Sequence, residues 1–140
     1  MKDIIERIKR IQDDFMRSEF HEPASESDIA AFERENGIVI PQSYRDFLLL
    51  SDGAELFGGD AFLYGVKNAR FKIGEDYTEG MVPKEFMILG FYHSRHVCFL
   101  PQKNCFIFYE YEEPDEIESE CLHFDSFYDI MEYFIDIATN

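Results

Sequence analysis

The stretch that decides the fold reads Arg95-His-Val-Cys-Phe-Leu-Pro-Gln-Lys-Asn-Cys-Phe-Ile-Phe-Tyr-Glu110. Two runs of aromatic and branched apolar residues flank a turn made of Pro-Gln-Lys-Asn, which is the pattern of a β-hairpin. If residues 101 and 104 flank the turn, the facing pairs are Phe99 with Phe106, Val97 with Phe108, Arg95 with Glu110, and Cys98 with Ile107. Apolar side chains then face each other and an arginine faces a carboxylate, so the register is chemically sensible.

Two further strands are predicted before the hairpin. Residues 86–91 form an apolar run, and Ala61-Phe-Leu-Tyr64 is bounded by Gly58-Gly59 and Gly65. Glycines of this kind typically mark turns between strands. Residues 67–84 mix glycine, proline and charged residues, and we expect mostly loop there with a possible short helix.

Apolar residues recur at helical spacing at both ends of the chain. Between residues 2 and 17 the stripe consists of Ile4, Ile5, Ile8, Ile11, Phe15 and Met16. Between residues 124 and 137 it consists of Phe127, Ile130, Met131, Phe134 and Ile137. Spacings of three and four residues place each stripe on one face of an α-helix. We therefore expect an amphipathic helix over residues 2–17 and another that closes the chain.

Two shorter helices are predicted between residues 25 and 53. Ser25-Glu-Ser-Asp28 has the form of a capping box, and Gly37 can end the helix that starts there. Pro41 preorganises the first turn of the next helix, and Gly53 can end it. The apolar face of that helix consists of Tyr44, Phe47, Leu48 and Leu50.

This order of elements predicts an α+β fold. Helices lie at both ends, a run of strands joined by short turns lies between them, and the strand–helix alternation of a parallel sheet is missing. We expect one domain spanning residues 1–140, with a single, largely antiparallel sheet covered by helices on one face. A chain of this length buries enough surface to need no disulfide or metal.

The charge balance disfavours two classes of partner. The chain has 13 Lys and Arg against 29 Asp and Glu, which gives a formal net charge of -16. The last basic residue is Lys103, and residues 104–140 hold 11 acids, so this segment alone carries -11. A surface of this sign repels nucleic acid and anionic membranes, so we expect neither as a direct partner.

From the sequence we expect neither a targeting segment nor a disulfide framework. Charged residues interrupt the N-terminus where a signal peptide needs an apolar run, and no run reaches the ~20 residues of a membrane span. Cys98, Cys105 and Cys121 are odd in number and lack Cys-x-x-Cys spacing. We expect a cytoplasmic protein with buried thiols and without a cofactor.

Three kinds of chemistry find little support. His96 and Cys98 share one side of a strand ~6–7 Å apart, which is too far for a nucleophile and its base to share a hydrogen bond. His93-Ser-Arg-His96 has helical ligand spacing, but it falls in a turn or strand and lacks further ligands. Gly58-Gly59 is followed by an acid, and no phosphate-binding glycine motif occurs. We therefore predict no catalytic residue and no metal site.

The strongest remaining feature is the acidic segment that follows the hairpin. Its candidate binding residues are Glu110, Tyr111, Glu112, Glu113, Asp115 and Glu116. We expect strand 105–111 to leave the core and become a charged, tyrosine-bearing edge, which either prevents sheet-to-sheet pairing or docks a cationic protein. Carboxylates without an interspersed cation repel one another, which favours docking. The next candidate is the loop with Asp52, Glu55 and Asp60.

The order of short motifs resembles the SUKH superfamily, which includes fungal cell-wall assembly regulators and bacterial immunity proteins. The matching motifs are Phe32-Glu33 with Gly37, Ile40-Pro41-x-x-Tyr44-x-x-Phe47-Leu48, Asp52-Gly53-Ala54, Leu89-Gly90 and Phe124-x-x-Phe127. Together they span nearly the whole chain.

The resemblance implies an α+β domain that binds a partner, with no cofactor and no reaction. Known bacterial members bind toxins, many of them nucleases. With the negative charge, this leads to the hypothesis of a cytoplasmic immunity protein that holds a basic toxin domain. Two alternatives stay open: an intracellular regulatory adaptor of the cell-wall regulator type, and an enzyme that uses Cys98 with His96, or His93 with His96.

Overall fold

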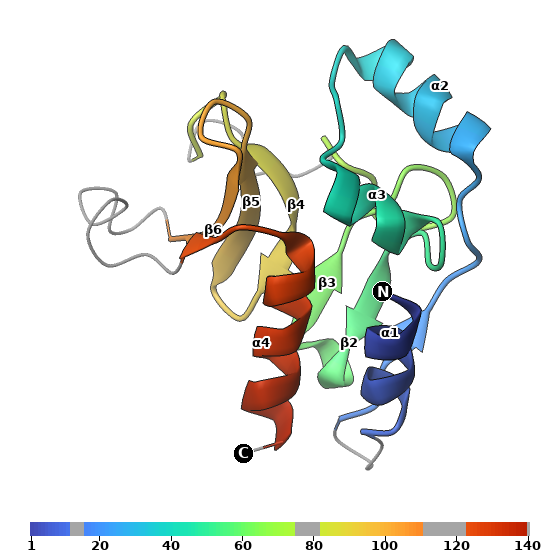
Figure 1. Cartoon of the computed structure of the whole chain (residues 1–140), viewed down its shortest axis with the longest axis vertical. Helices are drawn as coiled ribbons and strands as arrows, with labels where there is room; N and C mark the ends of the chain where they lie inside the picture. Colours follow the sequence, from blue (N-terminus) through green and yellow to red (C-terminus); the bar gives the residue numbers. More distant parts are fainter. Residues whose placement is uncertain (12–15, 75–81, 111–122, 140) are drawn as a thin grey trace.

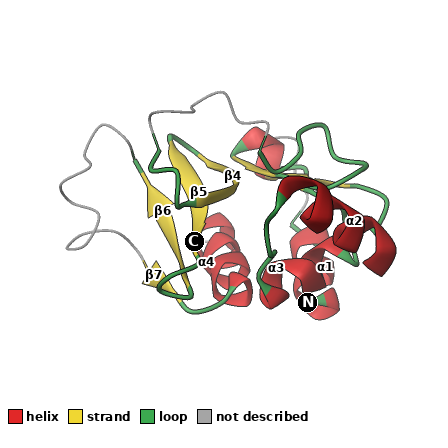
Figure 2. Ribbon diagram, turned by 90° about the horizontal axis from the view of Figure 1, so that it is seen from above, coloured by secondary structure: helices red, strands yellow, loops and turns green. Residues whose placement is uncertain are grey.

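The computed structural model describes residues 1–11, 16–74, 82–110 and 123–139. Within them the strands form one sheet in the order β1 to β7, and every neighbouring pair is antiparallel. Helices α1, α3 and α4 lie over one face of the sheet, and α2 lies beyond α3 (Figures 1 and 2). The predicted α+β class with a single antiparallel sheet is confirmed. The elements are α1 (Lys2–Lys9), β1 (Glu19–Phe20), α2 (Glu26–Asn36), α3 (Gln42–Leu48), β2 (Ala54–Leu56), the 3-10 turn η1 (Phe57–Gly59), β3 (Ala61–Leu63), β4 (Met87–Tyr92), β5 (Arg95–Leu100), β6 (Cys105–Tyr109), β7 (His123–Phe124) and α4 (Phe127–Thr139).

Helix α2 begins and ends as the sequence predicts. The Ser25 hydroxyl accepts the backbone N–H of Asp28 at 3.1 Å, and the Asp28 carboxylate accepts the N–H of Ser25 at 3.0 Å. This capping box lowers the pKa of the Asp28 carboxyl, because its charged form accepts the Ser25 backbone N–H. Gly37 ends the helix with a left-handed φ of 64°.

Helix α3 supplies the aromatic centre of the core. Tyr44 and Phe47 are fully buried, and their ring centroids lie 4.7 and 5.4 Å from that of Phe127 on α4. Leu48 is buried as predicted, but Leu50 is 40% exposed. The helix ends at Leu48 and not at Gly53, so Leu50 lies in a turn where the helical period no longer sets the direction of its side chain.

Helix α1 is shorter than the predicted helix over residues 2–17. It ends at Lys9, and Ile11 donates to the carbonyl of Ile8 at 3.0 Å in a tightened last turn. Arg17 is not helical, because its carbonyl accepts the N–H of Gly58 at 2.7 Å beside the sheet. Pairing with the sheet thus overrides the helical pattern, and Phe15 lies outside the described residues.

Helix α4 packs on α1 and on the sheet. Arg7 of α1 donates two hydrogen bonds to the Glu132 carboxylate at 2.5 and 3.0 Å, and this contact raises the pKa of Arg7. Of the predicted apolar stripe, Ile137 is 50% exposed, whereas Ile135 is buried. Ile135, and not Ile137, therefore belongs to the buried face of this helix. α4 has 13 residues, and no helix among the described residues is long and apolar enough to cross a membrane.

The predicted hairpin register is correct. Strands β5 and β6 pair Phe99 with Phe106 and Val97 with Phe108. Cys98 faces Ile107 in this register, so it does not face the other described cysteine. The predicted strands at 61–64 and 86–91 correspond to β3 and β4, with bounds shifted by one residue. Strands β1, β2 and β7 were not predicted. Each has only two or three residues, which is too short to show an alternation of apolar and polar side chains.

A buried carboxylate fixes the loop that follows β3. Asp52 accepts the backbone N–H groups of Val66 at 2.7 Å and Lys67 at 2.8 Å, and also that of Asn68. Gly65 passes so close that a Cβ there would lie 2.5 Å from the Asp52 Oδ1 atom. The Asp52-Gly53 motif therefore positions backbone and is not a free surface loop.

The hydroxyl of Tyr44 ties α3 to the same region. It donates towards the carbonyls of Tyr64 and Leu89, which lie 2.5 and 3.1 Å away. Burial raises the pKa of Tyr44 well above its usual value, so this hydroxyl stays protonated and keeps donating. The aromatic core and the sheet are thus joined by a polar contact as well as by packing.

We predict that Phe47→Ala lowers the free energy of unfolding by about 3–5 kcal/mol, because it leaves a cavity between Tyr44 and Phe127. The matched control is Leu50→Ala, a few residues further on, where the exposed side chain should cost much less. Chemical denaturation of both variants checks this. Equal losses would show that α3 does not bury the face described here.

We also predict that Asp52→Asn lowers the free energy of unfolding by about 2–4 kcal/mol, because an amide N–H₂ replaces an acceptor that faces backbone donors. Asp60→Asn is the control, since it removes one nearby negative charge and none of the hydrogen bonds to Val66, Lys67 and Asn68. A melting temperature equal to that of the control would contradict the role given to Asp52.

Candidate functional site

Of the six predicted binding residues, one lies in the described part of the chain. Glu110 directly follows β6, and its carboxylate lies 3.9 Å from the Arg95 guanidinium. Both side chains are partly exposed, so this pair contributes little to stability. The other five residues lie outside the described residues, namely Tyr111, Glu112, Glu113, Asp115 and Glu116.

The strand that leads into the acidic segment is not an edge strand, contrary to prediction. β6 pairs with β5 on one side and with β7 on the other, where Phe106 faces Phe124 and Ile107 faces His123. Tyr109 is buried, with its ring 5.5 Å from that of Phe86. The prediction failed because β7 has only two residues and follows the acidic segment in the chain.

The residues considered for catalysis or metal binding do not form an accessible site. His96 and Cys98 on β5 are both buried, so a substrate in solution does not reach either of them. His93 lies in the β4–β5 turn with a left-handed φ of 52° and is exposed, so the two histidines have different surroundings. No group of three or more potential metal ligands occurs among the residues that the structure describes.

The second acidic loop is only partly available to a partner. Asp52 is buried, and both its oxygens accept backbone hydrogen bonds. Glu55 on β2 and Asp60 before β3 are half-buried and remain on the surface. Of the three residues named for this loop, Asp52 is therefore excluded as a contact residue.

The sheet face that points away from the helices has two different halves. Over β4–β6, Val82 and Phe86 pack on a small apolar cluster that includes Cys98, Ile107 and Tyr109. Over β1–β3 the same face carries a hollow of about 590 Å³. The outer face is thus covered by the chain at one end and hollowed at the other.

A row of register partners crosses this outer face. It runs through Glu19, Glu55, Phe62, Phe91, His96 and Tyr109, each facing the next on the neighbouring strand. Residues that face each other in a sheet point to the same side of it. Exposure falls along the row, from the exposed Glu19 through half-buried Phe62 to buried Tyr109.

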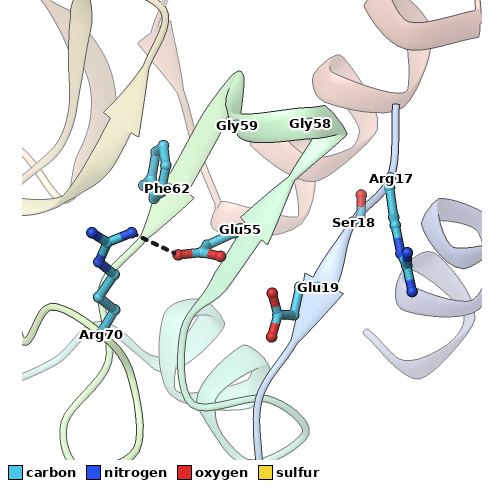
Figure 3. A pocket seen from close by; sticks show the side chains of 8 residues that line it. All are labelled: Arg17, Ser18, Glu19, Glu55, Gly58, Gly59, Phe62 and Arg70. Atoms are coloured by element: carbon cyan, nitrogen blue, oxygen red, sulfur yellow. Dashed lines mark ion pairs between the residues drawn. The ribbon is translucent and has the colours of Figure 1, made fainter. Parts of the chain in front are cut away.

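The hollow brings charged groups to an aromatic ring (Figure 3). Its lining residues are Arg17, Ser18, Glu19, Glu55, Gly58, Gly59, Phe62 and Arg70. The Glu55 carboxylate lies 3.8 Å from the Arg70 guanidinium. In Figure 3 the Glu19 side chain extends from β1 towards Glu55, whereas that of Arg17 runs down the other side of the strand. Such a mixed polar and aromatic surface is typical of a protein interface.

Of these lining residues, only Glu55 was proposed from the sequence as a possible contact for a partner. The others come together through β1, β2 and β3, which have two or three residues each. One signal was present, since Ala54-Glu-Leu56 and Ala61-Phe-Leu63 both place apolar residues on either side of a central outward residue. That pattern could have indicated that Glu55 and Phe62 point away from the core.

Comparison with known proteins agrees with this fold. A curated relative, the uncharacterized protein YnaB of Bacillus subtilis (strain 168), is 33% identical over 63 residues. That match covers 45% of this chain and 44% of the relative, so it spans less than half the relative's length. The model of the SMI1 / KNR4 family (SUKH-1) matches residues 23–130, which include α2, α3 and the strands from β2 to β7. The chain therefore belongs to the SMI1 / KNR4 family (SUKH-1).

Proposed function

We propose that this chain is an immunity protein that neutralises a co-encoded, nuclease-type toxin by binding its basic domain. The observation that carries the proposal is the charge of a chain of this family: -16 overall, with no basic residue after Lys103. Known bacterial members of the SUKH superfamily bind toxins, and the relative found here is bacterial. A nuclease needs a basic cleft for its substrate, and an acidic protein of this size can occupy such a cleft.

The proposed docking surface is the acidic segment. Its residues are Glu110, Tyr111, Glu112, Glu113, Asp115 and Glu116. The carboxylates would steer a cationic domain during the encounter, and the tyrosine would supply a rigid contact. Glu110 fits this role because its one described ion-pair partner, Arg95, is 3.9 Å away and holds it weakly.

In this role the protein acts in the cytoplasm by binding alone, with no catalytic step and no cofactor. The burial of His96 and Cys98 supports this part of the proposal, since the residues best suited to nucleophilic chemistry are closed to solvent. The same family resemblance also supports an intracellular adaptor of the cell-wall regulator type. The identity of the stoichiometric partner distinguishes the two roles.

The test replaces five acids of the segment in one variant: Glu110→Gln, Glu112→Gln, Glu113→Gln, Asp115→Asn and Glu116→Gln. We predict an unchanged or slightly higher melting temperature, because self-repulsion falls. Association with the toxin domain encoded by the adjoining gene should slow markedly, and the difference from the parent should shrink as salt screens the charges. Stopped-flow binding at low and high salt measures both effects.

The matched control removes five charges elsewhere, through Asp3→Asn, Glu6→Gln, Glu22→Gln, Glu35→Gln and Asp136→Asn. All five of these side chains are exposed. The control should associate faster than the segment variant at every salt concentration, although both have the same net charge. Full protection of toxin-expressing cells by the folded segment variant would rule out this docking surface. A stoichiometric partner that is a signalling protein would favour the adaptor role instead.

A further inference from the structure

We propose that the hollow over β1–β3 is a second docking site, which takes an arginine-bearing segment of a basic protein partner. The strands run in the order β1 to β7, so this site and Glu110 lie at opposite ends of the sheet. The inference rests on the proposed function only for the basic character of the partner. Its geometry is independent of the acidic segment.

The first argument is a pair of facing carboxylates, of which Glu55 has one weak ion pair and Glu19 has none among the described residues. Glu19 and Glu55 face each other across β1 and β2, and like charges in this position destabilise a sheet. Arg70 lies 3.8 Å from Glu55, but its side chain is 70% exposed, so the pair is weak. Glu19 forms no ion pair with any residue that the structure describes. An incoming cation between the two carboxylates would remove this repulsion.

The second argument is a partly exposed aromatic ring next to the carboxylates. Phe62 faces Glu55 directly and is half-buried on the outer face. Gly59, with φ 101°, lies beside this ring, and a Cβ there would be 3.9 Å from two ring carbons. Because the position is glycine, residue 59 itself places no side chain against the ring. A cation over an aromatic face is stabilised by the ring quadrupole.

These two features together fit a guanidinium better than an ammonium. A planar guanidinium can bond a carboxylate through two N–H groups and stack on a ring at the same time, whereas an ammonium is a point charge. Arg70 already lies 3.8 Å from the Glu55 carboxylate, but the cation–π contacts of the described residues involve other rings than Phe62. The Arg70 guanidinium lies 5.4 Å from the Phe71 ring centroid, and Arg17 runs down the other side of β1 in Figure 3.

The row continues into further apolar surface for the rest of the partner segment. Phe62 faces the half-buried Phe91, whose ring centroid is 5.8 Å from that of His96. In the described chain β1 is the end strand of the sheet, so a partner can approach the hollow from that side. The partner segment that fits this site therefore has an arginine next to an apolar residue.

The experiment uses the full chain and a synthetic peptide, Ac-Gly-Arg-Leu-Arg-Gly-NH₂. Amide chemical shifts are followed by NMR during titration, against a peptide in which citrulline replaces both arginines and keeps their shape without the charge. We expect the arginine peptide to shift the amides of residues 17–19, 55–59 and 62, and the citrulline peptide to shift them far less. Shifts confined to residues 110–116, or spread evenly over all acidic residues, would overturn the proposal.

A double variant, Glu19→Gln with Glu55→Gln, tests the carboxylates directly. We expect the affinity for the arginine peptide to fall about fivefold or more, as expected for the loss of exposed ion pairs near an aromatic ring. Glu35→Gln with Asp136→Asn removes the same charge from exposed positions on α2 and α4 and should leave the affinity unchanged. Equal affinities of the two double variants would contradict the site.

Phe62→Leu keeps an apolar side chain and removes the ring. This variant should bind the arginine peptide with lower affinity, and its NMR spectrum should remain that of a folded protein. These readouts need no toxin. Failure of toxin protection with intact peptide binding would count against the proposed function alone. Loss of the peptide site with intact toxin protection would count against this inference alone.

Discussion

The buried carboxylate of Asp52 is the interaction on which the arrangement of the chain depends. A charged group in the interior is tolerated only when it is fully hydrogen-bonded, and here three consecutive backbone amides satisfy it. Asp52 lies between α3 and β2, and the amides belong to the loop after β3, so one side chain fixes the start and the end of the β2–β3 hairpin. Tyr44 adds a bond from α3 to the same loop. These contacts hold the helices against one face of the sheet, and the other face points away from the helices.

This asymmetry of the sheet explains why binding is the function that the molecule supports best. The inner face is filled by aromatic side chains from α3, α4 and the strands, and the nucleophilic candidates His96 and Cys98 are buried on the outer face. Two charged surfaces on the described chain are open to a partner: Glu110 after β6, and the hollow with Glu19 and Glu55 over β1–β3. Surfaces of this kind govern the rate and specificity of association.

The parts of the fold that local chemistry determines could be predicted from the sequence. The Ser25 capping box, the Phe99–Phe106 register and most of the buried face of α3 depend on residues close together in the chain, and they are as expected, whereas Leu50 of the predicted face is exposed. The short strands β1 and β7 could not be predicted in this way, because tertiary pairing alone makes them strands. The same pairing shortens α1, and it turns the predicted edge at β6 into an inner strand.

The candidate site was less predictable than the fold, for the same physical reason. Glu110 was named from its charged neighbourhood, which is visible in the sequence. Glu19 and Phe62 are 43 residues apart, and only the pairing of β1, β2 and β3 brings them into one hollow. A charge run can be recognised locally, whereas a site assembled across three short strands requires the sheet.

The central proposal is that this protein binds its partner through Glu110 and the acidic residues that follow it, and through the hollow over β1–β3. Hydrogen–deuterium exchange of the full chain, free and bound to the proposed toxin partner, tests it most directly. The account predicts slower exchange on binding in peptides that contain residues 17–19, 55–62 and 110–116, with α1 and α4 unchanged. Protection confined to α1 and α4 would contradict it.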